Sequence, residues 1–161
     1  MSYPAIVIAN EIVKLANNEK VDLTPMKLQK ILYLANGICY KRKGQKLIKE
    51  NFEAWDYGPV IRSVYNVYKE CGGNNIDSPI EDFVSLNDHT FVRSSSIPID
   101  RADLTIIKEA WDNAKNLSAF TLSAWSHNKN SPWDITYNTH PKPNHISDET
   151  IKDYFDRFIT N

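Results

Sequence analysis

The sequence predicts a mainly α-helical protein: a compact, single-domain bundle of about six helices with a small β-hairpin near residues 83–93. Apolar residues recur at spacings of three and four in several segments, as on a helix with one buried face. Capping residues precede these segments, and glycines or asparagines follow several of them. A length of 161 residues suits one core, because two separate cores would each be small. We therefore expect residues 1–161 to fold as one domain.

The composition is that of an ordinary globular protein, with 42% apolar and 24% charged residues. The formal net charge of -1 argues against a general nucleic-acid coat, since phosphate binding draws on a surplus of Lys and Arg. A basic run from Lys41 to Lys49 is best interpreted as a helix end, because no aromatic residues interleave with its charges to stack on bases. The longest apolar run, Ala5 to Ala9, is far shorter than the roughly 20 residues that span a bilayer. With no signal peptide at its start, the chain is expected to be cytoplasmic and free of membrane contact.

Two helices are predicted before Gly44. The first runs from Pro4 to about Asn17. In the second, Thr24 caps free amides, Pro25 takes the first helical position, and Gly44 ends the run, which is long enough for the central helix of a small α domain. Its predicted buried face comprises Leu28, Ile31, Leu32, Ala35, Ile38 and Cys39, with Lys27, Lys30 and Asn36 pointing elsewhere.

The stretch from Phe52 to Gly72 carries the densest aromatic content of the chain. Its first few residues alternate too irregularly for a long strand. Proline suits the first helical position, and the residue before a proline is pushed out of the α region, so Gly58 and Pro59 predict a helix that begins at Pro59. The glycine pair at Gly72 supplies the end of that helix. Its predicted apolar stripe is Val60, Val64, Val67, Tyr68 and Cys71.

Two short β-rich runs follow, Phe83–Leu86 and Thr90–Arg93, and the turn between them predicts a hairpin. The serine-rich segment from Ser94 to Pro98 is expected to be an exposed loop.

Three further helices are predicted from N-cap candidates at Asp100, Ser118 and Ser147. Between the last two, Ser131-Pro132 argues against a helix, and a polar, proline-broken connection through Tyr137 is expected to run over the surface. The buried stripe of the last helix is predicted to be Ile151, Tyr154, Phe155 and Phe158.

No metal-binding or catalytic motif is present in the sequence. The histidines and cysteines lack the spacings of zinc sites, and His140 and His145 merely flank two prolines. There is no Gly-x-Ser-x-Gly elbow and no P-loop. Cys39 and Cys71 lie on apolar helix faces and are expected to be reduced, buried thiols. We expect no catalytic residue, no metal and no cofactor, with a dyad of Cys71 and His127 as the alternative.

The segment from Ser126 to Trp133 joins a histidine to a large aromatic residue across a proline turn. Two interpretations are open. In the first, His127 bonds backbone carbonyls of the loop while Trp133 fills the core. In the second, both side chains contact a partner.

Four stretches of the chain form a specific combination. They are Leu-Thr-Pro-Met-Lys-Leu-Gln-Lys-Ile-Leu-Tyr-Leu-Ala-Asn-Gly from Leu23, Phe-Glu-Ala-Trp-Asp-Tyr-Gly-Pro-Val-Ile-Arg-Ser-Val-Tyr from Phe52, Leu-Ser-Ala-Trp-Ser-His from Leu122 with Pro132-Trp133, and Ile-Lys-Asp-Tyr-Phe from Ile151. In this order they closely resemble the Panacea antitoxin domain, a family that includes SocA-like antitoxins and phage-associated GepA-like proteins. The resemblance covers nearly the whole chain.

The resemblance implies a mainly helical domain that is encoded beside a toxin gene in bacteria and their mobile elements. It implies that the protein neutralises the cognate toxin by direct protein–protein binding, without catalysis. A binding surface must stay accessible after the core is made, and the aromatic residues around Trp55 exceed what one helical stripe hides. The expected partner-binding residues are Trp55, Asp56, Tyr57, Arg62 and Tyr65, joined by His127 and Trp133.

Other functions remain open at this stage. The same fold would suit a proteolytic adaptor or a chaperone-like protein that binds a client. Less favoured are a small thiol-dependent enzyme based on Cys71 and a nucleic-acid binder based on Lys41 to Lys49. The toxin, its target and the oligomeric state do not follow from the sequence.

Overall fold

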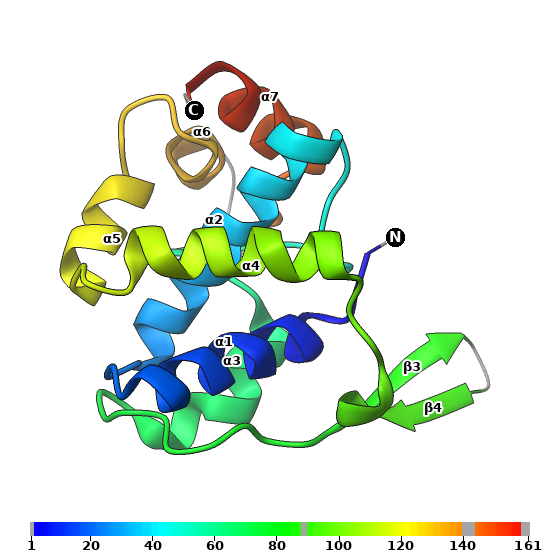
Figure 1. Cartoon of the computed structure of the whole chain (residues 1–161). Helices are drawn as coiled ribbons and strands as arrows, with labels where there is room; N and C mark the ends of the chain where they lie inside the picture. The colour runs from blue at the N-terminus through cyan, green and yellow to red at the C-terminus, as the bar shows by residue number, and fades with distance from the viewer. Residues whose placement is uncertain (1, 88–89, 140–143, 159–161) are drawn as a thin grey trace.

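A computed structural model describes residues 2–87, 90–139 and 144–158. Within these ranges the fold is mainly α-helical, with two small antiparallel hairpins (Figure 1). The helices are α1 (Ala5–Glu19), α2 (Pro25–Lys43), α3 (Arg62–Tyr68), α4 (Arg101–Ala114), α5 (Ala119–Ser126), α6 (Pro132–Thr139) and α7 (Asp148–Phe158). The hairpins are β1 (Glu53–Trp55) with β2 (Gly58–Val60), and β3 (Phe83–Asn87) with β4 (Thr90–Arg93).

Helix α2 lies at the centre of the molecule and packs against α1, α3, α4, α5, α7 and β2. Figure 1 shows α4 crossing in front of α2 and α1 below it, with α5 at the left and α6 and α7 toward the top. The predicted start and end of α2 are confirmed: Thr24 accepts a hydrogen bond from the amide of Lys27, and Gly44 ends the helix with a φ of 72°. At Gly37, a methyl group would overlap the Phe155 ring, so glycine lets α7 approach α2 closely.

The prediction that Lys27, Lys30 and Asn36 point away from the core was wrong. All three are buried, because neighbours cover α2 on nearly every side between residues 27 and 40. Each polar group is therefore hydrogen-bonded to backbone from another segment. Lys27 donates to the carbonyl of Lys115, Lys30 donates to that of Pro59, and the Asn36 side-chain oxygen accepts from the amides of Leu47 and Ile48.

A helix does not begin at Pro59, as the sequence had suggested. Gly58 and Pro59 instead lie in β2, which pairs with β1 so that Trp55 stands opposite Gly58 across a two-residue turn. The Gly58 φ of 115° suits this turn, and proline is acceptable in a short edge strand. Helix α3 begins only at Arg62 and continues into a 3-10 turn, Lys69–Cys71, before the predicted stop at Gly72.

The segment after Ser131 is helical, which corrects the expectation of a surface connection there. Ser131 Oγ accepts from the amide of Asp134, and Pro132 occupies the first position of α6, where its missing N–H costs nothing. Tyr137 therefore lies in a helix. The prolines expected later in that connection, at positions 141 and 143, lie outside the described residues.

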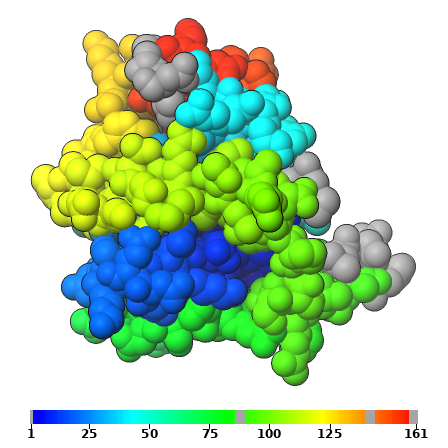
Figure 2. Space-filling model, viewed as in Figure 1, coloured from blue at the N-terminus to red at the C-terminus, as the bar shows by residue number. Residues whose placement is uncertain are grey.

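The remaining predicted elements are confirmed with small changes. The β3–β4 hairpin forms and stands at one edge of the molecule (Figure 1 and Figure 2). The segment that follows it is not a wholly exposed loop, because residues Ser94–Ser96 form a 3-10 turn whose first serine is buried and accepts from the amide of Asp82. Ser118 and Ser147 cap α5 and α7 as predicted. Asp100 precedes α4 without a side-chain cap.

Both cysteines are free thiols, and only Cys39 is fully buried. No helix in the described part of the chain is long and apolar enough to cross a membrane.

Candidate functional site

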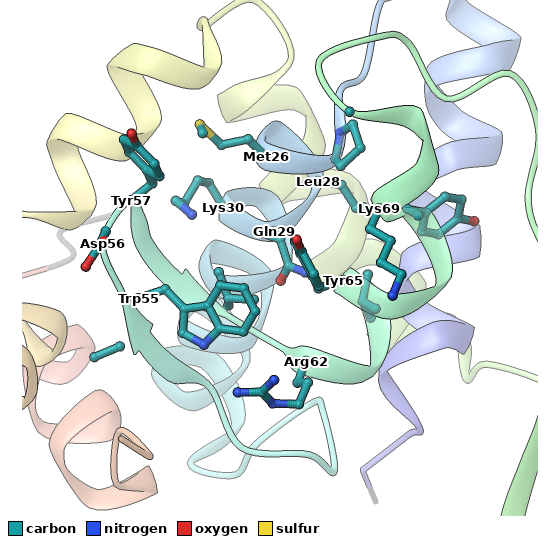
Figure 3. Close-up of a pocket in the computed structure, with 16 residues that line it drawn as sticks. Met26, Leu28, Gln29, Lys30, Trp55, Asp56, Tyr57, Arg62, Tyr65 and Lys69 are labelled. Atoms are coloured by element: carbon teal, nitrogen blue, oxygen red, sulfur yellow. The ribbon is translucent and has the colours of Figure 1, made fainter. Parts of the chain in front are cut away.

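A groove opens between the start of α2, the β1–β2 hairpin and α3 (Figure 3). Its volume is about 690 Å³, within the range of pockets that hold a compact ligand or a short peptide segment. In Figure 3, Trp55, Asp56 and Tyr57 border it on the hairpin side, while Arg62, Tyr65 and Lys69 border it on the α3 side. Met26, Gln29 and Lys30 of α2 form its floor.

Aromatic side chains make the wall of the groove. The Trp55 and Tyr65 rings meet edge to face, with centroids 4.8 Å apart. Tyr57 is 68% exposed and Tyr65 is 41% exposed, so both reach the surface as the sequence had indicated. Tyr68 does not, because its ring is in the core and its hydroxyl donates to the Asn10 side chain. The groove thus offers large apolar surfaces that the core does not cover.

Glu53 holds Trp55 and Arg62 in fixed positions. Its carboxylate accepts from Trp55 Nε1 at 2.9 Å and from Arg62 Nη2 and Nε at 2.9 and 3.2 Å. The Arg62 guanidinium also lies 5.1 Å from the Trp55 ring centroid, a cation–π distance. Burial by itself raises the pKa of Glu53, but the hydrogen bonds from Arg62 and Trp55 outweigh it and leave that pKa below its ordinary value. Glu53 is therefore a charged anchor beneath the indole.

The turn of the β1–β2 hairpin is held from behind by α5, α6 and the segment between them. Three successive main-chain carbonyls of the turn each accept a hydrogen bond from a side chain there. The pairs are Trp133 Nε1 with Trp55 O at 2.6 Å, His127 Nε2 with Asp56 O at 3.1 Å, and Ser123 Oγ with Tyr57 O at 2.8 Å. In addition, the Tyr137 hydroxyl donates to the Asp56 carboxylate at 2.5 Å. Because three of these four bonds end on main-chain carbonyls, these groups set the shape of the turn.

The donors are themselves packed into one aromatic stack. The His127 ring lies 3.8 Å from the Trp133 ring, and the Trp133 ring lies 4.3 Å from that of Tyr137. Trp133 is buried, and neither it nor His127 lines the groove. This geometry matches the first interpretation of the Ser126 to Trp133 segment, in which the histidine bonds loop carbonyls and the tryptophan fills the core.

Two polar side chains of α2 meet the hairpin and the start of α3. Gln29 accepts from the Ile61 amide at 2.9 Å and donates to the Ile61 carbonyl at 3.1 Å, which satisfies the backbone just before α3. Lys30 Nζ donates to the Pro59 carbonyl at 3.2 Å. Burial lowers the pKa of Lys30 to about 7.

The structure thus brings five of the seven predicted residues to one groove: Trp55, Asp56, Tyr57, Arg62 and Tyr65. The sequence prediction missed Met26, Gln29 and Lys30. A usable signal was available, since a helix surrounded by other elements must bury its polar residues, and a buried glutamine or lysine needs a specific partner.

Metal ligation and thiol chemistry depend on how the candidate ligands and the cysteines of the described residues are placed. No group of three or more His, Cys, Asp and Glu side chains there is placed to hold a metal ion. His140 lies outside these residues. Burial raises the pKa of the Cys39 thiol to about 11.

The fold is mainly helical with an aromatic groove, and comparison with known proteins defines the class of the protein. The chain belongs to the family described as "Antitoxin SocA-like, Panacea domain", whose model matches residues 28–134. The matched range includes the β1–β2 hairpin, α3 and all three side chains that bond the turn carbonyls.

Among individual proteins, the chain is similar to antitoxin SocA of Caulobacter vibrioides, with 32% identity over 160 residues. The aligned region covers 96% of this chain and 83% of that relative. No solved structure was found to match the chain.

Proposed function

We propose that this protein is a non-enzymatic antitoxin that neutralises a protein toxin by binding it directly, with the Trp55–Tyr65 groove as the contact surface. Membership of the SocA-like antitoxin family supports the antitoxin role. The observation that carries the binding mode is the set of aromatic side chains left accessible around the groove, with Tyr57 68% exposed. Trp, Tyr and Arg are the residues that most often dominate the energetics of protein interfaces.

The rigidity of the groove also favours binding. An interface loses affinity when loops and side chains must be ordered on association. Here the turn carbonyls are already bonded and the Trp55 ring is fixed by Glu53, Tyr65 and Arg62. Little ordering is left to occur when a partner arrives. The partner is proposed to be a toxin encoded by an adjacent gene and met in the cytoplasm.

The test is a binding titration with the purified toxin encoded by the neighbouring open reading frame, in an inactivated form. Tyr57→Ala is expected to weaken binding by at least about 10-fold, as for an interface anchor worth more than about 1.4 kcal/mol. Phe120→Ala is the matched control, because Phe120 is an 83% exposed aromatic on α5 that does not line the groove. Equal affinities for the wild-type protein and both variants would place the toxin-binding surface elsewhere.

A second candidate function, delivery of the toxin to a protease, is favoured by the β3–β4 hairpin. An adaptor needs a second surface besides the one that binds its client. Phe83 and Phe91 lie on the same face of this hairpin and are 65% and 64% exposed. If the protein is an adaptor, toxin survival in cells should depend on the housekeeping protease, and Phe83→Ser should prolong toxin lifetime without weakening toxin binding.

A further inference from the structure

Lys30 lies on the floor of the groove with its charge almost unmatched. Only 1% of the residue is exposed, and its one hydrogen bond within the described chain goes to the Pro59 carbonyl. An ammonium group carries three donors. No carboxylate of a described residue forms an ion pair with it, although such pairs are present at Lys43, Lys46 and Lys108. A buried cation without a partner is costly and is seldom kept for stability alone.

The direction of the Lys30 side chain connects it to the groove. Figure 3 shows it extending from α2 toward the hairpin, into the space between Tyr57 and Trp55. The Gly58 position confirms the tight fit on the hairpin side, where an added methyl group would lie 2.8 Å from Lys30 Cε. Burial lowers the pKa of Lys30 to about 7, so a nearby anion would determine whether the amine is charged.

The charges around the groove favour an acidic occupant. Lys30, Arg62 and Lys69 line it, and Asp56, which accepts from Tyr137, is the one acidic residue among the described residues that do so. The Arg62 charge is already paired with Glu53, which leaves Lys30 and Lys69 against Asp56. This positive surplus stands out in a chain with a formal net charge of -1. Between these charges the lining is apolar or aromatic, as at Met26 and Tyr65. An occupant that complements the groove therefore combines an apolar group with an anion.

We propose that the groove takes a short segment of the toxin that packs an apolar side chain against Trp55 and Tyr65 and places an Asp or Glu side-chain carboxylate on Lys30 Nζ. This inference rests on the proposed function and names the chemistry of the partner at the same site. A carboxylate there would accept charge-assisted hydrogen bonds from donors that have no other partner, and it would stabilise the charged form of the amine. Because only 1% of Lys30 is exposed, the pair would form where little water reaches, and it would be stronger there than at the surface.

The first arm of the test compares two lysine variants by calorimetric titration with the inactivated toxin from the neighbouring gene. Lys30→Met keeps the apolar stem and removes the charge, and we expect it to weaken binding by about 30-fold or more, as for loss of one partner of a buried ion pair. Lys27→Met is the matched control and should bind like the wild type. Lys27 is a buried lysine of the same helix that donates to the Lys115 carbonyl and does not line the groove.

The second arm changes only the toxin, so that it does not depend on the folding of an antitoxin variant. Each Asp and Glu of the toxin is replaced by its amide in turn. One such replacement should weaken binding to the wild-type antitoxin strongly and add nothing in the Lys30→Met background, which identifies the pair by a double-mutant cycle.

The outcomes separate this inference from the proposed function. Failure of the toxin to bind the wild-type protein would overturn both. If Tyr57→Ala weakened binding while Lys30→Met bound with wild-type affinity, the groove would remain the contact surface. The proposed contact between a toxin carboxylate and Lys30 would then be overturned. The absence of any toxin amide replacement that couples to Lys30 would overturn it as well.

Discussion

The indole N–H of Trp133 donates to the main-chain carbonyl of Trp55 at 2.6 Å, across 78 residues of sequence. This bond joins α6 to the last residue of β1, next to the turn that carries Asp56 and Tyr57. The Trp55 side chain thus faces the groove while its backbone is held by a buried tryptophan on the other side. One hydrogen bond thus connects the residue that carries an aromatic ring of the groove to a tryptophan of the core.

Replacing Trp133 with phenylalanine should remove this hydrogen bond. Trp133→Phe retains an aromatic ring beside His127 and Tyr137 but leaves the Trp55 carbonyl without its donor. We expect the free energy of unfolding, from urea denaturation, to fall by about 1–3 kcal/mol. Toxin affinity should fall about 2- to 10-fold, because the turn must then be ordered on binding.

Trp125→Phe is the control for this variant. Trp125 packs near Tyr33 and Phe155, and its indole forms no hydrogen bond with a described residue. It should lower stability through lost packing and leave toxin affinity unchanged. Equal effects of the two changes on affinity would show that the bond to Trp55 does not shape the groove.

Glycine is required at position 58 for two reasons. Its φ is 115°, and an added Cβ would lie 2.6 Å from Ser126 Oγ and 2.8 Å from Lys30 Cε. Gly58→Ala should therefore lower the free energy of unfolding by about 2 kcal/mol or more. Gly73→Ala should change it by less than about 0.5 kcal/mol, because nothing lies within 4 Å of the position an added Cβ would take. Similar denaturation midpoints for the two variants would contradict the geometry of the turn.

Arg62 and Arg42 offer a matched pair of arginines. Each forms two hydrogen bonds to a glutamate, Arg62 to Glu53 and Arg42 to Glu109, but only Arg62 lies over an aromatic ring of the groove. Arg62→Ala should weaken toxin binding by about 10-fold, through loss of its own contacts and of the order it gives Trp55. Arg42→Ala should leave binding unchanged in the same titration. If Trp55→Ala also bound normally, the aromatic wall would have no part in recognition.

The stability of the protein should depend on pH through Lys30. Its pKa lies at about 7 in the folded protein and near 10.5 when the chain unfolds, so between these values the unfolded state binds more protons. The free energy of unfolding must therefore rise with pH across this window. Relative to Lys30→Met, the wild type should gain about 1 kcal/mol per pH unit between about pH 7.5 and 9.5. At pH 6, Lys30→Met should be the more stable protein, since the wild type then carries a buried charge.

Denaturation of both proteins over this pH range checks the expectation. A difference in stability that does not change with pH would mean that Lys30 titrates normally. In the complex, the same logic predicts that the toxin suppresses this pH dependence, because a bound carboxylate would keep the amine charged.

Local signals were enough to predict most of the helical fold. Thr24, Pro25 and Gly44 bound α2 as their backbone chemistry requires, and Ser118 and Ser147 cap α5 and α7. They failed where proline occurs in two different structures. Pro132 follows a serine and begins a helix, whereas Pro59 follows a glycine and lies in a strand. Proline fixes only its own φ and removes a donor, so the choice depends on what lies nearby.

The candidate site, too, could be predicted only in part from the sequence. The sequence by itself determined that Trp55, Tyr57, Tyr65 and Arg62 are crowded into one short segment, more aromatic surface than a single helix face can hide. Only the tertiary structure decided that Tyr68 turns inward, that His127 and Trp133 support the turn from behind, and that Lys30 lies beneath it. These decisions depend on contacts between residues up to 78 positions apart, such as Trp55 and Trp133, and local propensity does not encode such contacts. For Lys30 the physical reason is the enclosure of the middle of α2, because a helix covered on nearly every side buries its polar residues, and these are bonded mostly to distant segments.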